Sequence, residues 1–300
     1  MEQRWIFLNG KYVKKEEATI SVFDHGFLYG DGIFEGIRVY NGNIFRLREH
    51  MVRLYDSAKV IMLDIPYTLE ELEQHVAETV RKNELRDAYI RLIVSRGIGD
   101  LGLDPAKCSQ PSVIVIADQV TMYPQEVYEN GLEIATVPTR RNIPEALNPK
   151  IKSLNYLNNV LAKIEASRAG IGEALLLSND GYVAECSGDN IFLVKGGVLY
   201  TPPSAIGALE GITRQAIIDI CARIGYTVKE ERFTRYDVYT ADEAFLTGTA
   251  AEVIAVVDVD GRKIGSGKPG TVTKQLLEEF RKIVQVEGFN AYEPVSHTTR

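Results

Sequence analysis

The run from Glu185 to Phe192, with the residues that follow it, constrains the fold of this chain more than any other stretch. Two apolar, β-forming segments, 191–194 and 198–200, flank a glycine-rich turn at 195–197. Apolar segments around such a turn are typical of a β-hairpin. Because Glu185 comes just before the first segment, the sequence predicts a carboxylate near the end of a sheet.

A helix start follows the hairpin. The segment from Gly211 to Ile218 opens an amphipathic helix. The first backbone N–H groups of a helix have no partner within it, so they are available to an anion such as phosphate, and the Thr213 hydroxyl adds a donor there. Together with Glu185, this segment predicts a site that meets a phosphate at one end and a pyridine nitrogen at the other.

The spacing from Glu185 to Arg214 resembles the signature of the fold-type IV, pyridoxal-phosphate-dependent aminotransferases, which fixes many positions over about thirty residues. The resemblance runs from Phe7-Leu8-Asn9-Gly10 to the Gly-Thr-Ala-Ala-Glu run at 248–252 and the Val-Thr-Lys run near 273. Within that family the chain is most similar to branched-chain amino acid aminotransferases. The resemblance implies a two-domain, α+β or mixed α/β fold of the D-amino acid aminotransferase type, with pyridoxal 5'-phosphate as cofactor.

Bulk properties agree with this fold. With 300 residues, 45% of them hydrophobic, the chain can bury one or two sizeable cores, and its length suggests two domains. A net charge of −7 argues against nucleic acid. The sequence has no apolar run of roughly 18 residues and no signal-peptide layout, so we expect no membrane contact and a cytoplasmic location. Three scattered cysteines favour neither a disulfide framework nor a metal site.

The first domain is expected at 1–120, as an α+β unit. Asn-Gly turns at 9–10 and 41–42 predict two hairpins. The other elements expected in this domain are helices at 48–63 and 69–82, the second with a capping box from Thr68, and strands at 88–96 and 112–118.

The segment 121–131 contains Pro and Gly and loses the alternation, so we place the interdomain linker there. The second domain, 132–300, contains the candidate cofactor lysine. Its expected elements are strands at 132–138, 173–178, 182–200, 227–234 and 243–258, and helices at 155–169, 212–225 and 270–284.

Transamination of this type needs a lysine that forms an imine with the cofactor aldehyde and carries the substrate α-proton. Burial beside cationic groups can keep such a lysine partly deprotonated near neutral pH. Lys150 and Lys152 point to the same side of an extended segment, so spacing does not choose between them. The resemblance selects Lys152, since the family places its lysine directly before a Ser-Leu-Asn element; the alternative is a solvated surface lysine.

The resemblance also implies the other cofactor contacts. Glu185 would bind the pyridine nitrogen and keep it protonated, so that the ring accepts electrons when the α-proton leaves; the alternative is a solvated residue at a strand edge. Tyr156 would flank the cofactor. Phosphate contacts are expected from Arg53, Ile212, Thr213 and Thr249. The alternative for Arg53 is an ion pair on its helix face with Glu49.

Substrate recognition must accept a branched apolar side chain and, in the second half-reaction, the acidic side chain of glutamate. An apolar wall with one reachable cation suffices. The resemblance implies that Phe34 and Tyr29 line the apolar side and that Arg91 meets the distal carboxylate of 2-oxoglutarate, directly or through Tyr29. The α-carboxylate would be bound by Tyr89, Thr249 and Ala250. The alternative is that these aromatic residues lie in a core or an interface.

The glycine-rich run 96–105 follows a strand but reaches Pro105 without opening a helix, so a dinucleotide-binding loop is not predicted. The family uses this loop at the active-site rim, where it can come from a neighbouring subunit. We therefore predict a homodimer at minimum, with Tyr29 and this loop crossing the interface, and a trimer of dimers as a larger assembly.

The implied reaction is transamination between branched-chain L-amino acids (Leu, Ile, Val) and 2-oxoglutarate, giving branched 2-oxoacids and L-glutamate, with Lys152 as Schiff base and proton carrier. The expected partners are these small amino acids and 2-oxoacids. Three alternatives stay open: a D-amino acid aminotransferase, a lyase of the aminodeoxychorismate type that would not need Arg91, and a cofactor-binding protein without turnover.

Overall fold

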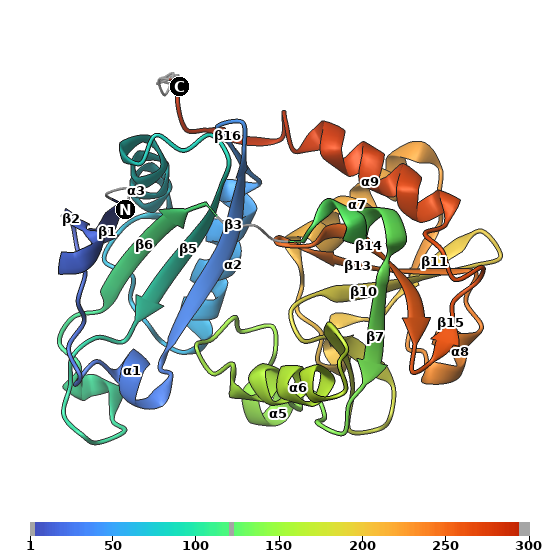
Figure 1. Ribbon diagram of the computed structural model, residues 1–300. Helices are drawn as coiled ribbons and strands as arrows, with labels where there is room; N and C mark the ends of the chain where they lie inside the picture. The colour runs from blue at the N-terminus through green and yellow to red at the C-terminus, as the bar shows by residue number, and fades with distance from the viewer. Residues whose placement is uncertain (1–3, 120–122, 294–300) are drawn as a thin grey trace. The chain divides into compact units, whose positions relative to one another are not determined.

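The computed structural model describes residues 4–119 and 123–293. The chain divides into two compact units (Figure 1). Unit 1 contains the described residues up to 119 and those from 283 onward, and unit 2 contains those from 123 to 282. Among the described helices, none has the length and apolar character that a membrane span requires.

Unit 1 is built on a seven-stranded antiparallel sheet with the order β16-β4-β3-β5-β6-β1-β2. Its strands are β1 (Trp5–Leu8), β2 (Lys11–Lys14), β3 (Gly32–Tyr40), β4 (Asn43–Phe45), β5 (Ala88–Ser95), β6 (Ser112–Asp118) and β16 (Gly288–Asn290). Its helices are α1 (His25–Tyr29), α2 (Leu47–Val60) and α3 (Leu69–Lys82), with 3-10 turns at Lys15–Glu17 and Pro105–Lys107.

Both predicted hairpins of unit 1 are confirmed. Leu8 pairs with Lys11 around the Asn9-Gly10 turn, and both turn residues have positive φ, as a two-residue hairpin turn requires. The capping box at Thr68 is confirmed too, because Thr68 accepts from the Glu71 backbone N–H while the Glu71 carboxylate accepts from the Thr68 N–H. The predicted helices and strands therefore form where local signals place them.

Alternation along β5 separates the two faces of this sheet. Ile90, Leu92 and Val94 are fully buried, whereas Tyr89 and Arg91 point to the opposite face and are half-buried. Helix α2 packs against β3, and α3 packs against β1, β5 and β6. One face thus forms the core of unit 1, and the other presents polar side chains.

Unit 2 contains a second, nine-stranded sheet with the order β12-β11-β10-β13-β14-β7-β8-β9, in which β15 also pairs with β14. Its strands are β7 (Leu132–Thr136), β8 (Glu173–Leu177), β9 (Val183–Cys186), β10 (Asn190–Lys195), β11 (Val198–Thr201), β12 (Val228–Glu230), β13 (Glu243–Gly248), β14 (Glu252–Val259) and β15 (Arg262–Lys263). Its helices are α4 (Gln125–Asn130), α5 (Pro144–Leu147), α6 (Leu157–Arg168), α7 (Ile212–Ile224), α8 (Arg235–Tyr239) and α9 (Thr271–Ile283), with a 3-10 turn at Ser204–Ile206.

Packing in unit 2 holds the hairpin region in place. Helix α7 packs on β13, and α6 packs on β7 and β8. The rings of Phe192 in β10 and Phe245 in β13 stack in parallel, 5.0 Å apart. The predicted hairpin of 191–200 is confirmed by the pairing of β10 with β11. Glu185 precedes β10 near one end of the sheet, as predicted, and itself belongs to the edge strand β9.

The end of the chain differs from the expected domain 132–300. Residues from Ile283 onward group with unit 1, because β16 pairs with β4 and the Asn43 side chain donates hydrogen bonds to Val284 O at 2.8 Å and Glu287 O at 3.1 Å. The expected linker 121–131 also differs in part: 121–122 lie outside the described residues, and helix α4 packs on β14 of unit 2.

Candidate active site

The Glu185 carboxylate is held by three donors within unit 2. Oε1 forms an ion pair with Arg141 Nη2 at 2.7 Å, and Oε2 accepts from Asn190 Nδ2 at 3.1 Å and from Leu209 N at 2.9 Å. A carboxylate accepts about four hydrogen bonds in total, so one position is left for another donor. Glu185 is therefore a fixed, buried acceptor and not the solvated strand-edge residue that was the alternative.

The N-terminus of α7 forms the second part of the site. Gly211 is its N-cap, and the backbone N–H groups of the first turn have no partner inside the helix. A Cβ at Gly211 would lie 2.1 Å from Asn190 Oδ1, so only glycine fits against the side chain that also holds Glu185. Ile212 and the buried Thr213 start the helix, and the Arg214 side chain turns away to Glu230, 2.6 Å from its Nη2.

The two candidate lysines lie in different surroundings. Lys150 Nζ pairs with Glu210 at 2.7 Å, and both side chains are about half exposed. Lys152 Nζ donates to the Tyr156 hydroxyl at 3.0 Å, and its charge acts on the buried Asp189. The structure thus brings Lys152 and Tyr156 together, and it leaves Lys150 in a surface ion pair.

Thr249 and Ala250 lie in the tight turn between β13 and β14, which the Gly248–Glu252 pair closes. A Cβ at Gly248 would lie 1.9 Å from Asp189 Oδ1, so this turn packs directly against the Asp189 carboxylate. Burial, and next the charge of Glu173, raise the pKa of Asp189 to about 7. An acid whose pKa is raised to about 7 therefore packs against this turn, and the charge of Lys152 acts on it.

In unit 1, Arg53 projects from α2 toward β3. Its Nε and Nη2 bind both oxygens of Glu35, at 2.8 and 2.7 Å, and His50 Nδ1 lies 2.7 Å from Glu35 Oε2. Burial alone would raise the pKa of Glu35, but the charges of Arg53 and His50 lower it to about 2. Arg53 is thus fixed by an ion pair with the strand, whereas the alternative placed its partner, Glu49, on the helix.

Three of the predicted substrate residues meet on the half-buried face of the unit 1 sheet. The Arg91 guanidinium lies 4.6 Å from the centre of the Phe34 ring, and Arg91 Nη2 donates to the Tyr89 hydroxyl at 3.2 Å. Gly36 pairs with Arg91 across the strands, and a Cβ there would lie 2.0 Å from the Tyr89 hydroxyl oxygen. The Arg91 cation therefore lies against an aromatic surface, and Arg38, which pairs with Tyr89, stands on the same face.

Tyr29 belongs to a different part of unit 1. It ends α1, and its hydroxyl donates to Leu101 O at 2.5 Å. His25 Nε2 lies 2.8 Å from Asp100 O, so helix α1 and the glycine-rich loop are held together. The tyrosine thus packs with the loop that is expected at the subunit interface.

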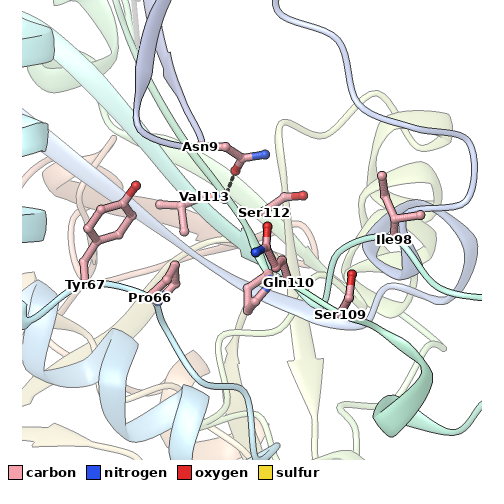
Figure 2. A pocket seen from close by; sticks show the side chains of 9 residues that line it. Asn9, Pro66, Tyr67, Ile98, Ser109, Gln110, Ser112 and Val113 are labelled. Carbon is pink, nitrogen blue, oxygen red and sulfur yellow. Dashed lines mark hydrogen bonds between the residues drawn. The ribbon is translucent and has the colours of Figure 1, made fainter.

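A cavity of about 340 Å³ in unit 1 contains none of the predicted site residues (Figure 2). It lies between the β1–β2 turn, the α2–α3 loop and the start of β6, where Asn9 Oδ1 accepts from Val113 N at 2.7 Å. Its lining is neutral, so it offers no charge for a phosphate or a carboxylate. Across the described residues, no cluster of three or more His, Cys, Asp or Glu could hold a metal.

Three residues of the site were not predicted. Asp189 and Asn190 stand inside the recognised run, and their polarity between two apolar segments was a usable signal. Arg141 had no such signal, because its position follows a strand end and resembles any surface arginine. The contact with Glu185 depends on the tertiary fold.

These groups fit pyridoxal 5'-phosphate. The N-terminus of α7 suits a phosphate, the vacant acceptor position on Glu185 suits a ring N–H, and the Lys152 amine suits an aldehyde. Residues 32–259 match the family model described as amino-transferase class IV. The chain therefore belongs to the class IV aminotransferases, which are enzymes that use pyridoxal 5'-phosphate as cofactor.

Within this family, the chain is similar along nearly its whole length to branched-chain amino acid aminotransferases. A Methanocaldococcus jannaschii protein with that provisional name is 53% identical, over 96% of this chain and 99% of its own. The structure of the Thermoproteus uzoniensis enzyme with norvaline is 41% identical, with a TM-score of 0.89, over 94% of this chain and 95% of its own. The Escherichia coli enzyme gives 37% identity and a TM-score of 0.92, over 97% of this chain and 98% of its own. The predicted fold-type IV architecture is confirmed.

Proposed function

We propose that this enzyme transfers the amino group of the branched-chain L-amino acids leucine, isoleucine and valine to 2-oxoglutarate, giving branched 2-oxoacids and L-glutamate. The similarity to branched-chain aminotransferases supports the donor class. A further such enzyme, 42% identical and solved with N-(5'-phosphopyridoxyl)-L-glutamate, supports glutamate as the partner. The observation that carries the proposal is the contact of the Arg91 guanidinium with the Phe34 ring, since one pocket must accept both an apolar and an acidic side chain.

Lys152 is the proposed covalent anchor, or Schiff-base lysine, and the proton carrier. When bound, the cofactor supplies an aldehyde for the substrate amine and a ring that withdraws electrons. The Lys152 amine then takes the α-proton and returns it, while the Tyr156 hydroxyl, 3.0 Å away, orients that amine. Glu185 holds the ring-nitrogen proton with its remaining acceptor position.

The proposed phosphate contacts are the backbone N–H groups of Ile212 and Thr213, the hydroxyls of Thr213 and Thr249, and the guanidinium of Arg53. The α7 N-terminus supports the first two, because helix N-termini favour anions. For the substrate α-carboxylate we propose the Thr249–Ala250 turn and the Tyr89 hydroxyl. Two backbone N–H groups in a tight turn, together with a hydroxyl, are suitable donors for a carboxylate.

For the substrate side chain we propose that Phe34 and Tyr29 form the apolar wall and that Arg91 binds the distal carboxylate of glutamate and 2-oxoglutarate. A charge-assisted bond of Arg91 with that carboxylate would contribute about 1.5–3 kcal/mol. Leucine makes no such bond. The two substrates therefore differ in what they require of Arg91.

The experiment compares Arg91→Gln with Arg86→Gln, an exposed arginine of unit 1 that lies 4.0 Å from the Tyr292 ring. We expect Arg91→Gln to lower kcat/KM for L-glutamate by about 10- to 100-fold and to affect L-leucine much less. Arg86→Gln should leave both unchanged. Equal losses for both substrates in Arg91→Gln would contradict the role of Arg91.

Half-reactions of the wild-type protein separate the remaining alternatives. A change of the cofactor absorption with L-leucine that 2-oxoglutarate reverses supports the proposed reaction. A response to D-alanine alone indicates a D-amino acid aminotransferase. No response to either amino acid favours a lyase or a binding protein, and pyruvate release without a 2-oxoacid acceptor identifies the lyase.

We also propose that the active protein is a homodimer, with a trimer of dimers as a larger assembly. Helix α1 and the glycine-rich loop expose an apolar group that includes Phe27, Ile98, Leu101 and Leu103, of which Leu103 is 77% exposed. Exposed apolar patches of this kind mark interaction surfaces. Light scattering at low protein concentration tests this, and an active monomer would refute it.

A further inference from the structure

Arg141 is a buried arginine whose guanidinium binds three parts of unit 2. Nη2 lies 2.7 Å from Glu185 Oε1, Nε donates to Gly207 O at 3.0 Å, and Nη1 donates to Asn159 Oδ1 at 3.0 Å. The side chains of Arg141 and Glu185 are only 5% and 6% exposed. A buried charge pair is tolerated when further hydrogen bonds reach both groups, as those of Asn190 and Leu209 with Glu185 do here.

Through its bond with Gly207, Arg141 also contacts the loop that precedes α7, at the phosphate end of the proposed cofactor site. Gly207 has a φ of +106°, and a Cβ there would lie 3.2 Å from Arg141 Cγ and 3.1 Å from Asn142 O. Glycine at this position therefore permits the close approach of the arginine. From Gly207 the chain continues to Leu209, whose N–H binds Glu185 Oε2, and to Gly211, the N-cap of α7.

The third bond fixes the guanidinium to helix α6. Asn159 accepts from Arg141 through Oδ1, and its Nδ2 donates to Ser187 O at 2.8 Å, next to β9. One planar guanidinium thus contacts β9, the loop before α7 and α6 at once. A fork of fixed donors is suited to such a junction, whereas the single ammonium of lysine is not.

We propose that Arg141 is a positioning residue for the cofactor, which fixes the Glu185 carboxylate at the ring-nitrogen end and joins it to the Gly207–Gly211 loop at the phosphate end. The inference rests on the proposed role of Glu185 and deepens it. Arg141 acts in two ways, through its charge, which pairs with the buried Glu185 carboxylate at 2.7 Å, and through its fork, which sets the spacing between the two ends.

The experiment separates charge from spacing with Arg141→Met and Arg141→Lys. Arg140→Met is the matched control, since Arg140 is adjacent in sequence and exposed. Each variant is purified as cofactor-loaded protein. The readouts are the dissociation constant for pyridoxal 5'-phosphate and the pH midpoint of the visible band of the resting protein, neither of which depends on turnover.

We expect Arg141→Met to weaken cofactor binding about tenfold or more, because it leaves a buried carboxylate without its partner. The pH midpoint should also rise by about one unit, since removal of a nearby cation favours protonated forms. Arg141→Lys keeps the cation and loses the bonds to Gly207 and Asn159, so it should keep the wild-type midpoint and still bind the cofactor more weakly. Arg140→Met should match the wild type in both readouts.

A cycle with Glu185→Gln tests whether Arg141 acts through Glu185. The effect of Arg141→Met should become small in the Glu185→Gln background. An undiminished effect there, or wild-type affinity in both Arg141 variants, would overturn the proposal. If Glu185→Gln itself binds the cofactor normally, the role proposed for Glu185 falls as well; if only the Arg141 variants behave normally, the inference falls and that role stands.

Discussion

Replacement of Asp189 by asparagine should abolish a specific pH dependence of stability. Asp189 lies in the turn between β9 and β10 and is only 8% exposed. Burial, followed by the charge of Glu173, raises its pKa to about 7, although Lys163 acts in the opposite direction. The folded protein therefore binds a proton on this carboxyl far more tightly than the unfolded chain does.

The sign follows from the raised pKa. Stabilisation by this proton is complete below the ordinary aspartate value of 3.8 and is lost as the pH rises through about 7. Each pH unit within that window lowers the free energy of unfolding by about 1.4 kcal/mol, and the whole window amounts to about 4 kcal/mol. Asparagine has no proton to lose, so Asp189→Asn should not show this slope.

The assay is urea unfolding of the cofactor-free wild type and Asp189→Asn at intervals from about pH 5 to about pH 8. The difference in unfolding free energy between the two proteins should shift in favour of the variant by about 2 kcal/mol between about pH 5 and pH 7. Because only the change of this difference with pH is compared, any pH-independent effect of the asparagine side chain on the unfolding free energy cancels. Asp64→Asn, at an exposed position, is the control and should run parallel to the wild type.

Parallel curves for Asp189→Asn and the wild type would refute the reasoning, because they would show that Asp189 is ionised throughout the window. A second variant tests the cause. Glu173→Gln removes the largest contribution after burial, so it should lower the pKa of Asp189 and shrink the slope. An unchanged slope in Glu173→Gln would leave burial as the whole cause.

The other predictions concern the lysine, the buried acid of unit 1 and the interface. Lys152→Ala should abolish turnover and the visible band of the loaded protein, whereas Lys150→Ala should keep both, as absorption spectra would show. Glu35→Gln should lower the free energy of unfolding at neutral pH by about 3 kcal/mol in urea titrations. This contribution of Glu35 is present above its ordinary pKa of 4.5 and is lost as the pH falls through about 2; a variant as stable as the wild type would contradict it. Leu103→Glu should shift the light-scattering mass toward a monomer, and an unchanged dimer would exclude this loop from the interface.

Local chemistry explains which elements were predictable. Asn-Gly turns and the Thr68 capping box act over two to four residues, and the structure forms each of them. The short helices α1, α4, α5 and α8 were missed because one or two turns carry no readable period. For α1 a signal did exist, since Asp24 caps its first turn and Gly30 ends it with a positive φ.

Long-range pairing explains what was not predictable. The segment after Ile283 returns to unit 1 through an edge strand of three residues, and such a strand has no pattern of its own. The ion pair of Arg53 with Glu35 was equally unpredictable, since nothing in the sequence of α2 indicates a partner in β3. Contacts between distant elements follow from the fold, which the family resemblance supplied and the residue pattern alone did not.

The same distinction applies within the candidate site. The run from Glu185 to Phe192 contains the proposed partner of the cofactor ring nitrogen, Glu185, which is recognisable because its neighbours have a fixed spacing. The proposed role of Glu185 also requires a fixed orientation of its carboxylate. Arg141, Asn190 and Leu209 occupy three of its acceptor positions, so the fourth points in a defined direction. Two of those donors, Arg141 and Leu209, lie outside the run from Glu185 to Phe192, and the Leu209 donor is a backbone N–H that only proline would remove. A substitution of Arg141 leaves Glu185 in place and removes one of the contacts that orient its carboxylate. It therefore tests whether cofactor binding depends on the orientation of Glu185 as well as on its presence.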